Sequence, residues 1–180
     1  FAKSGQFYLT EPQRHMANNS VAYNEKPTCT EFLDEWISLA KNGTGERGIF
    51  NRGGLKAQLP ARRWKVFEKH AGSSGTNPCG EINLRSKQFC NLSEVVARLE
   101  DTFETLMKKV RVATILGTYQ STLTKFPFLS GEWKKNCEEE RLLGVSITGQ
   151  WDCPAVRAPE ILSKLREESI RVNKIYASKF

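Results

Sequence analysis

The feature that most restricts the fold of this chain is an irregular segment near its middle, residues 71–80 (AGSSGTNPCG). Its glycines and serines favour turns over helix or strand, and Pro78 keeps the backbone of Asn77 out of the helical region. We therefore expect an extended or tightly turned loop. Such a loop holds its cysteine, Cys79, by backbone geometry, so the sulfur can point into a cavity.

Short β-type segments alternate with longer amphipathic patterns on both sides of this loop. The β-type segments are residues 17–24, 48–51, 81–84 and 142–147. The helical patterns are residues 28–43, a segment after Ser93, and residues 103–116, 132–140 and 159–180. Strands that alternate with helices predict an α/β fold. Because the strands are few and short for 180 residues, we expect the sheet or barrel to be completed by polypeptide outside this chain.

The expected helices carry start signals and apolar faces. Thr28 with Glu31, and Asp101 with Glu104, form capping-box patterns, and Ser93 and Pro159 indicate two further helix starts. Apolar residues then recur at helical spacing: Phe32, Leu33, Trp36, Ile37 and Ala40; Phe103, Leu106, Val110, Ala113 and Leu116; Ile161, Leu162, Leu165, Val172 and Ile175. We expect these faces to be buried.

The composition is typical of a soluble globular domain. Hydrophobic residues make up 39% of the chain and charged residues 26%. No apolar run approaches the roughly 18 residues that cross a bilayer, and no secretory signal opens the chain, so we expect a cytoplasmic protein without a membrane partner. Because the first residue is Phe1, we expect the chain to begin inside a longer polypeptide or to have had its start processed or left out.

The net charge of +7 is compatible with two anionic partners, a nucleic acid or the phosphates of a nucleotide. The densest basic stretch contains Arg52, Lys56, Arg62, Arg63 and Lys65. With Trp64 and Phe67 as stacking groups, it would form a nucleic-acid-binding module. The scatter of the other charges favours a solvated basic surface instead, and nucleic acid is not an expected partner.

The five cysteines form neither a disulfide scaffold nor a zinc motif. They are odd in number and irregularly spaced, they contain no CxxC, and His15 and His70 have no supporting ligands nearby. We therefore expect mostly free thiols in a reducing compartment and no metal site. Cys137 is expected at a surface or boundary and Cys153 in a loop.

Residues 77–81 (NPCGE) combine groups that suit a substrate with vicinal hydroxyls. The amide of Asn77 can hold hydroxyls and the carboxylate of Glu81 can take a proton from one. Cys90, eleven residues after Cys79, could reach the same pocket from an adjacent strand. A lone loop cysteine is more often a small buried hydrophobic residue, so the residues alone leave both interpretations open.

Residues 77–81, followed by FCNLSEV at residues 89–95, resemble the active-site loop of ribonucleotide reductases. Other segments resemble the adenosylcobalamin-dependent (class II) branch in order and spacing: GERGIFNR at 45–52, KVRVATILGTYQSTLTKF at 109–126, EERLLGVSITG at 139–149 and ESIRVNKIYA at 168–177. An ordered series of segments is more specific than one short motif. The resemblance covers the chain from about Arg14 to its end.

The resemblance implies a fold and a set of roles. Residues 1–180 would be a fragment of the single ten-stranded α/β barrel domain of these enzymes, with a finger loop at about residues 71–90. Cys79 would carry the thiyl radical that removes hydrogen from C3′ of the ribonucleotide. Glu81 would be the base for the 3′-hydroxyl, and Asn77 would bind the ribose hydroxyls. Cys90 would be one of two thiols that supply electrons and end as a disulfide.

The resemblance also implies partners. The cofactor would be adenosylcobalamin, the substrate a ribonucleoside triphosphate and the reductant a thioredoxin-type protein. The cysteine that pairs with Cys90, the phosphate-binding loop and the allosteric specificity loop would lie outside this chain, because Cys29 is not part of a matching motif. The chain is therefore expected to need the remaining part of the reductase for turnover. A reductase whose radical comes from a subunit with a metal–oxygen centre is the alternative within the family.

Overall fold

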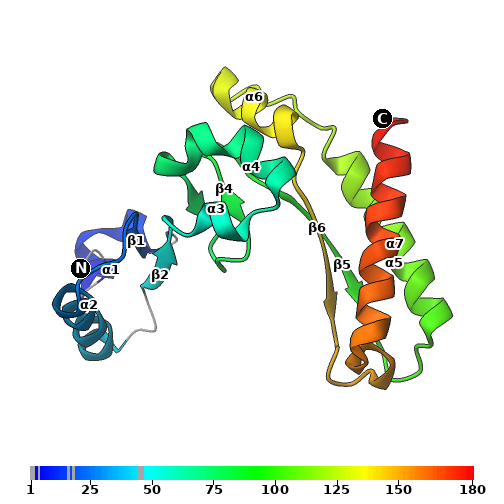
Figure 1. Cartoon of the computed structure of the whole chain (residues 1–180), viewed down its shortest axis with the longest axis horizontal. Helices are drawn as coiled ribbons and strands as arrows, with labels where there is room; N and C mark the ends of the chain where they lie inside the picture. Colours follow the sequence, from blue (N-terminus) through cyan, green and yellow to red (C-terminus); the bar gives the residue numbers. More distant parts are fainter. Residues whose placement is uncertain (1–2, 4, 16, 18, 44–46) are drawn as a thin grey trace. The chain divides into compact units, whose positions relative to one another are not determined.

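The computed structural model describes residue 3, residues 5–15, residue 17, residues 19–43 and residues 47–180 (Figure 1). The chain divides into two compact units, Phe1–Ser86 and Lys87–Phe180, and each unit is described by itself. Asn18, in the first expected strand, and Gly45 and Glu46, in one of the matching segments, lie outside the described residues.

The first unit is built on a short parallel β-α-β arrangement. Strand β1 (Ser20–Tyr23) pairs in parallel with β2 (Gly48–Asn51), with Val21 opposite Ile49, and helix α2 (Cys29–Asn42) connects them. The expected capping box begins α2, since the Thr28 hydroxyl accepts from the Glu31 N–H and the Glu31 carboxylate accepts from the Thr28 N–H. Gly43, at a φ of +63°, ends the helix as predicted.

The rest of the first unit places a small hairpin beside short helices. Helices α1 (Phe7–Thr10) and η1 (Pro12–Arg14) precede β1, whereas α3 (Leu55–Gln58), α4 (Ala61–Phe67) and η2 (Glu68–Ser73) follow β2. Strands β3 (Gly75–Thr76) and β4 (Asn83–Leu84) then pair antiparallel. The second of these strands is shorter than the expected 81–84, because residues 81 and 82 belong to the turn.

The second unit is a parallel strand pair packed against two long helices. Strand β5 (Asn91–Val96) pairs with β6 (Leu143–Thr148), with Val95 opposite Ile147. Helices α5 (Phe103–Gln120) and α6 (Gly131–Glu140) lie between these strands in the sequence, and η3 (Pro154–Arg157) and α7 (Pro159–Ala177) follow them. Figure 1 shows α5 and α7 lying alongside each other, and these helices pack closely.

The core of the second unit joins β5, α5 and α7. Its buried side chains are Val95, Ala97, Leu106, Val110, Ala113, Cys153, Val156 and Leu165. Gly149 brings the chain after β6 back against β5: a Cβ at this position would lie 2.3 Å from the Ala97 carbonyl oxygen, and its φ is +75°. Leu106, Val110 and Ala113 of α5 and Leu165 of α7 are buried in this core. Their predicted inward position is therefore confirmed.

Three expectations about local structure are wrong. Ser93 does not begin a helix, because it lies in the middle of β5, where cross-strand pairing with β6 overrides its capping preference. The capping box of α5 is formed by Thr102 and Thr105 instead of Asp101 and Glu104, and Asp101 accepts hydrogen bonds from Lys109 and Thr105. Leu116 is 61% exposed and Ile175 is 39% exposed, so neither belongs to the buried faces expected for α5 and α7.

The fold is mixed α/β, as the sequence predicts, with three two-stranded sheets among the described residues. The ten-stranded barrel and the finger loop remain expectations from the resemblance. Across the described ranges, no helix combines the length and apolar character that a bilayer crossing demands.

Candidate active-site loop

The NPCGE segment forms the tip of the β3–β4 hairpin. Gly75 is paired with Leu84 and Thr76 with Asn83. Beyond these pairs the Asn77 N–H donates to the Ile82 carbonyl at 3.1 Å, which extends the hairpin by one step. Residues 78–81 therefore project from a short two-stranded base, as the sequence predicts for a tightly turned loop.

A four-residue turn carries Cys79 at the tip. The Gly80 N–H donates to the Asn77 carbonyl at 3.0 Å, so Pro78 and Cys79 occupy the two central positions. Asparagine first, proline second and glycine fourth are favoured at these positions of a β-turn. Gly80 has a φ of +84°, a conformation that glycine adopts at little cost. The thiol of Cys79 is free and exposed.

The side chain of Asn77 links both ends of the turn. Its Oδ1 accepts from the Ile82 N–H at 3.0 Å, and its Nδ2 donates to Oε1 of Glu81. The structure thus brings Asn77 and Glu81 into contact, and the two flank the exposed Cys79. One N–H donor and the carbonyl oxygen of the amide are used, which fixes the orientation of the Asn77 side chain.

Cys90 belongs to the second unit. It is half-buried, has a free thiol and lies immediately before Asn91, the first residue of β5. Cys79 belongs to the first unit. The predicted approach of the two thiols therefore stays a prediction.

A polar cavity of about 310 Å³ lies beside the loop within the first unit. It is lined by Ser20, Ala22, Phe50, Arg52, Gly75, Thr76, Asn77 and Pro78. The cavity thus joins the first half of the loop to the β1–β2 pair. Its size falls at the lower end of the range for small-molecule sites, about 300–1,000 Å³.

Two arginines of the basic stretch bind the hairpin backbone, which the sequence did not indicate. Arg52 Nε donates to the Ser74 carbonyl at 2.9 Å, and Arg63 Nη2 donates to the Asn83 carbonyl at 2.6 Å. The Arg63 guanidinium also lies 4.8 Å from the centre of the Phe67 ring. Phe67 is 0% exposed, so it is not available to stack on a base, as the nucleic-acid interpretation requires.

The remaining cysteines differ in their surroundings. Cys137 is only 6% exposed, so its expected place at a surface or boundary is wrong: it faces inward from α6. Cys153 is buried in the loop before η3, where the sequence placed it. Among the described residues, no group of three or more His, Cys, Asp or Glu side chains could hold a metal ion.

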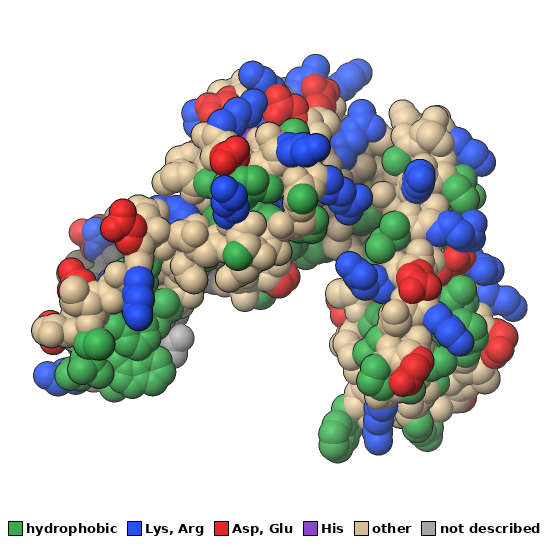
Figure 2. All heavy atoms as spheres, in the orientation of Figure 1, with side chains coloured by type: hydrophobic (Ala, Val, Ile, Leu, Met, Phe, Trp, Pro, Cys, Tyr) green, Lys and Arg blue, Asp and Glu red, His purple; other side chains and the backbone are tan. Residues whose placement is uncertain are grey.

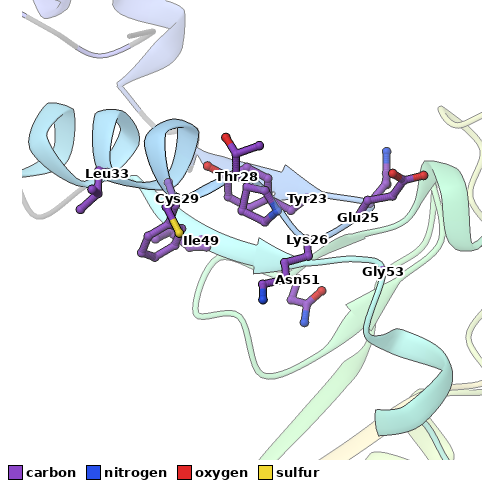
Figure 3. Close-up of a pocket in the computed structure, with 12 residues that line it drawn as sticks. Tyr23, Glu25, Lys26, Thr28, Cys29, Leu33, Ile49, Asn51 and Gly53 are labelled. Atoms are coloured by element: carbon purple, nitrogen blue, oxygen red, sulfur yellow. The ribbon is translucent and has the colours of Figure 1, made fainter.

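A larger, mostly apolar cavity lies between α2 and the β1–β2 pair. Its volume is about 840 Å³, and its lining includes Cys29 and Leu33 of α2 and Ile49 of β2, all of which are labelled in Figure 3. The apolar face of α2 is not buried as expected, since Trp36 is 57% exposed. Figure 2 shows hydrophobic side chains gathered over this part of the first unit. Phe32, Leu33 and Ile37 on the same face are exposed as well.

Comparison with known proteins gives one consistent class of relative. The chain is 31% identical over 149 residues to the adenosylcobalamin-dependent ribonucleoside-triphosphate reductase of Lacticaseibacillus paracasei. It is 27% identical over 146 residues to the reductase of the same name from Lactobacillus gasseri and 30% identical over 151 residues to that from Levilactobacillus brevis. The chain resembles part of a reductase.

These similarities cover 77% of this chain but only 18% of the length of each relative. No protein-family model matches the chain, and no solved structure matches it significantly. The comparisons therefore support the resemblance to adenosylcobalamin-dependent reductases in two ways: the relatives share that name, and the similarity extends over part of their length.

Proposed function

We propose that this chain is a catalytic segment of an adenosylcobalamin-dependent ribonucleoside-triphosphate reductase and that Cys79 is its radical residue. The observation that carries the proposal is the turn itself. An exposed thiol stands at the tip of a hairpin, flanked by a hydrogen-bonded amide and carboxylate, in a chain whose relatives bear that reductase name. A reaction that moves a hydrogen atom needs such a positioned sulfur, since reach and orientation supply much of the rate.

Each loop residue then has a chemical task. The thiyl sulfur of Cys79 takes the hydrogen atom from C3′, which forms an S–H bond and leaves a carbon radical on the ribose. Glu81 accepts the proton of the 3′-hydroxyl, and the amide of Asn77 hydrogen-bonds the ribose hydroxyls. The 2′-hydroxyl takes a proton from a thiol of the reducing pair and leaves as water, and Glu81 later returns its proton to the 3′-oxygen.

Cys90 and a cysteine from the remaining part of the enzyme supply the two electrons. They end as a disulfide, which requires their Cα atoms to come within about 4–7 Å. Cys79 then returns its hydrogen atom to C3′, and the product is the deoxyribonucleotide. A thioredoxin-type reductant reopens the disulfide for the next cycle.

Adenosylcobalamin, when bound, supplies the one-electron chemistry that converts the Cys79 thiol into a thiyl radical. The exposed position of Cys79 fits this role, because a bulky group can approach the tip of the turn. The residues that hold the cofactor belong to the remaining part of the reductase in this proposal. The name shared by the relatives favours this radical source over a subunit with a metal–oxygen centre.

The proposal is tested in a complete reductase that contains this segment, with adenosylcobalamin, anaerobically and without a second subunit. Cys79→Ser should abolish formation of deoxyribonucleotide while ribonucleotide binding persists. Cys90→Ser should allow one turnover at most. Cys29→Ser, which changes another exposed thiol of the first unit, should leave the rate within about twofold of wild type. Product formation by Cys79→Ser would refute the assignment, and a requirement for a second subunit would favour the metal-centre alternative.

A further inference from the structure

The Cys79 hairpin has a base of only two residue pairs, Gly75 with Leu84 and Thr76 with Asn83. An isolated two-stranded hairpin of this size is marginal in water. Its position must therefore be held by contacts with other elements of the first unit. The side chains that supply these contacts decide how firmly the sulfur is placed.

Arg52 binds the segment that leads into the first strand of the hairpin, β3. It follows β2, and its Nε donates to the carbonyl of Ser74, the residue directly before β3. Its Nη1 donates to Oδ1 of Asn24, just beyond β1, at 3.3 Å. The guanidinium also lies 5.8 Å from the ring centre of Phe50. One side chain thus ties the hairpin to both strands of the parallel pair.

Arg63 binds the second strand of the hairpin, β4. It lies on α4, donates to the carbonyl of Asn83 in β4, and is seated against the buried ring of Phe67. Figure 1 shows α4 next to β4, in agreement with this bond. Both arginines are half-buried, which sets them apart from Lys56, Arg62 and Lys65, the exposed members of the same basic stretch.

From this geometry we infer that Arg52 and Arg63 form a two-point clamp that positions the loop of Cys79. Each guanidinium donates to a backbone carbonyl on one side of the hairpin, Ser74 before β3 or Asn83 in β4. Neither bond therefore depends on the side chains at the tip. Hydrogen bonds from a charged donor contribute more than neutral ones. Arg52 also lines the polar cavity beside Asn77, so a change in the clamp reaches the cavity and the loop together. The role of the clamp in catalysis rests on the proposed function, whereas its existence does not.

The test uses the 180-residue chain and hydrogen–deuterium exchange of the amides of Asn77, Gly80 and Ile82, all of which donate within the loop. Arg52→Met and Arg63→Met keep the apolar stem and remove every donor. Each should speed exchange of these amides at least about tenfold relative to the amides of α2, because loops open locally when their anchors are lost. Lysine at either position keeps a charged donor and should restore most of the protection.

The matched controls are Arg62→Met on the same helix and Lys56→Met in the same basic stretch. Neither residue has a hydrogen bond or ion pair to the hairpin within the described ranges. Both variants should leave loop exchange within about twofold of wild type. Unchanged exchange in the Arg52 and Arg63 variants would refute the clamp. Equal acceleration in α2 would also refute it, since the arginines would then stabilise the whole unit without a specific effect on the loop.

Activity provides a separate measurement. In a complete reductase, Arg52→Met and Arg63→Met should lower kcat at least about tenfold and raise KM by a smaller factor, because the loop that they position carries the reacting sulfur as well as the proposed ribose contact of Asn77. If the loop amides respond but the wild-type reductase makes no deoxyribonucleotide, the clamp stands and the proposed function fails. If the amides respond and kcat is unchanged, the clamp has no positioning role in the reaction.

Discussion

At the scale of single residues, Asn77 determines the form of the loop around the thiol. Its backbone carbonyl closes the turn, and its side chain bonds both the Ile82 N–H and the Glu81 carboxylate. Serine or alanine could not make both side-chain bonds. The amide therefore has a structural role in addition to the proposed contact with ribose.

Asn77→Asp should destabilise the loop in a pH-dependent way. The aspartate keeps an acceptor for the Ile82 N–H but places a second carboxylate beside Glu81, and adjacent like charges disfavour ionisation. We expect faster exchange of the Ile82 amide than in wild type at pH 7, with the difference reduced near pH 4, after correction for intrinsic exchange. Asn77→Ala is the control, since it removes both bonds and adds no charge. A pH-independent difference in Asn77→Asp would contradict this account.

At the scale of helices and strands, the start of α5 depends on its cap. The Thr102 hydroxyl accepts from the Thr105 N–H, whereas Ser130, at the start of α6, has no such side-chain bond. Thr102→Ala should lower the free energy of unfolding of the second unit by about 1 kcal/mol. Ser130→Ala should change it by less than about 0.5 kcal/mol. Urea denaturation followed by circular dichroism measures both values, and equal effects would show that the cap is not what stabilises α5.

The contact between α5 and α7 includes a carboxylate that is sensitive to acid. Glu168 on α7 accepts from Arg171 and from Arg111 of α5, and its side chain is 8% exposed. Hydrogen bonds from Arg171 and then Arg111 lower the pKa of Glu168 from 4.5 to about 2. Because folding lowers this pKa, the stabilisation is complete above about pH 4.5 and is lost as the pH falls toward 2.

Glu168→Gln should therefore destabilise the second unit by about 2 kcal/mol at pH 7, since charge-assisted bonds are replaced by neutral ones. The difference in the free energy of unfolding between wild type and Glu168→Gln should become smaller as the pH approaches 2. Glu167→Gln, the adjacent change on the same helix, should cost less than about 0.5 kcal/mol at either pH. Unfolding midpoints at pH 7 and pH 3 measure the effect. A gap for Glu168→Gln that does not change with pH would show that the ion pairs are not responsible.

Local signals in the sequence predict some elements well and others poorly. The helix that follows Thr28 and the one that begins at Pro159 are predicted because a capping box or an N-terminal proline lies within a few residues of periodic apolar residues. Strand β5 was missed at Ser93, since its partner β6 lies about fifty residues away and the pairing leaves no local signal. The turn at Cys79 was predicted from Pro78 and Gly80. The contacts of Arg52 and Arg63 with the hairpin could not be predicted. Their acceptors are backbone carbonyls, which every residue has, so no residue type in the sequence marks them.

At the scale of the whole molecule, the net charge of +7 does not by itself indicate specific binding to nucleic acid. Two of the basic residues of the stretch 52–65 are engaged with backbone carbonyls, and the aromatic Phe67 is buried. Binding to DNA should therefore be weak and unspecific, and should disappear between about 50 and 200 mM salt. Lys56→Met should weaken it at least as much as Arg52→Met. Tight binding that survives 200 mM salt would support the nucleic-acid interpretation instead.

The chain spans 18% of the length of its relatives, so its proposed reductase activity is tested in a complete enzyme. The most direct measurement is electron paramagnetic resonance of a complete reductase containing this segment, frozen during turnover with adenosylcobalamin and ribonucleoside triphosphate. A radical signal should form with wild type and with Cys29→Ser, and it should be absent with Cys79→Ser. An undiminished signal in Cys79→Ser would contradict the claim that the sulfur at the tip of this turn carries the radical.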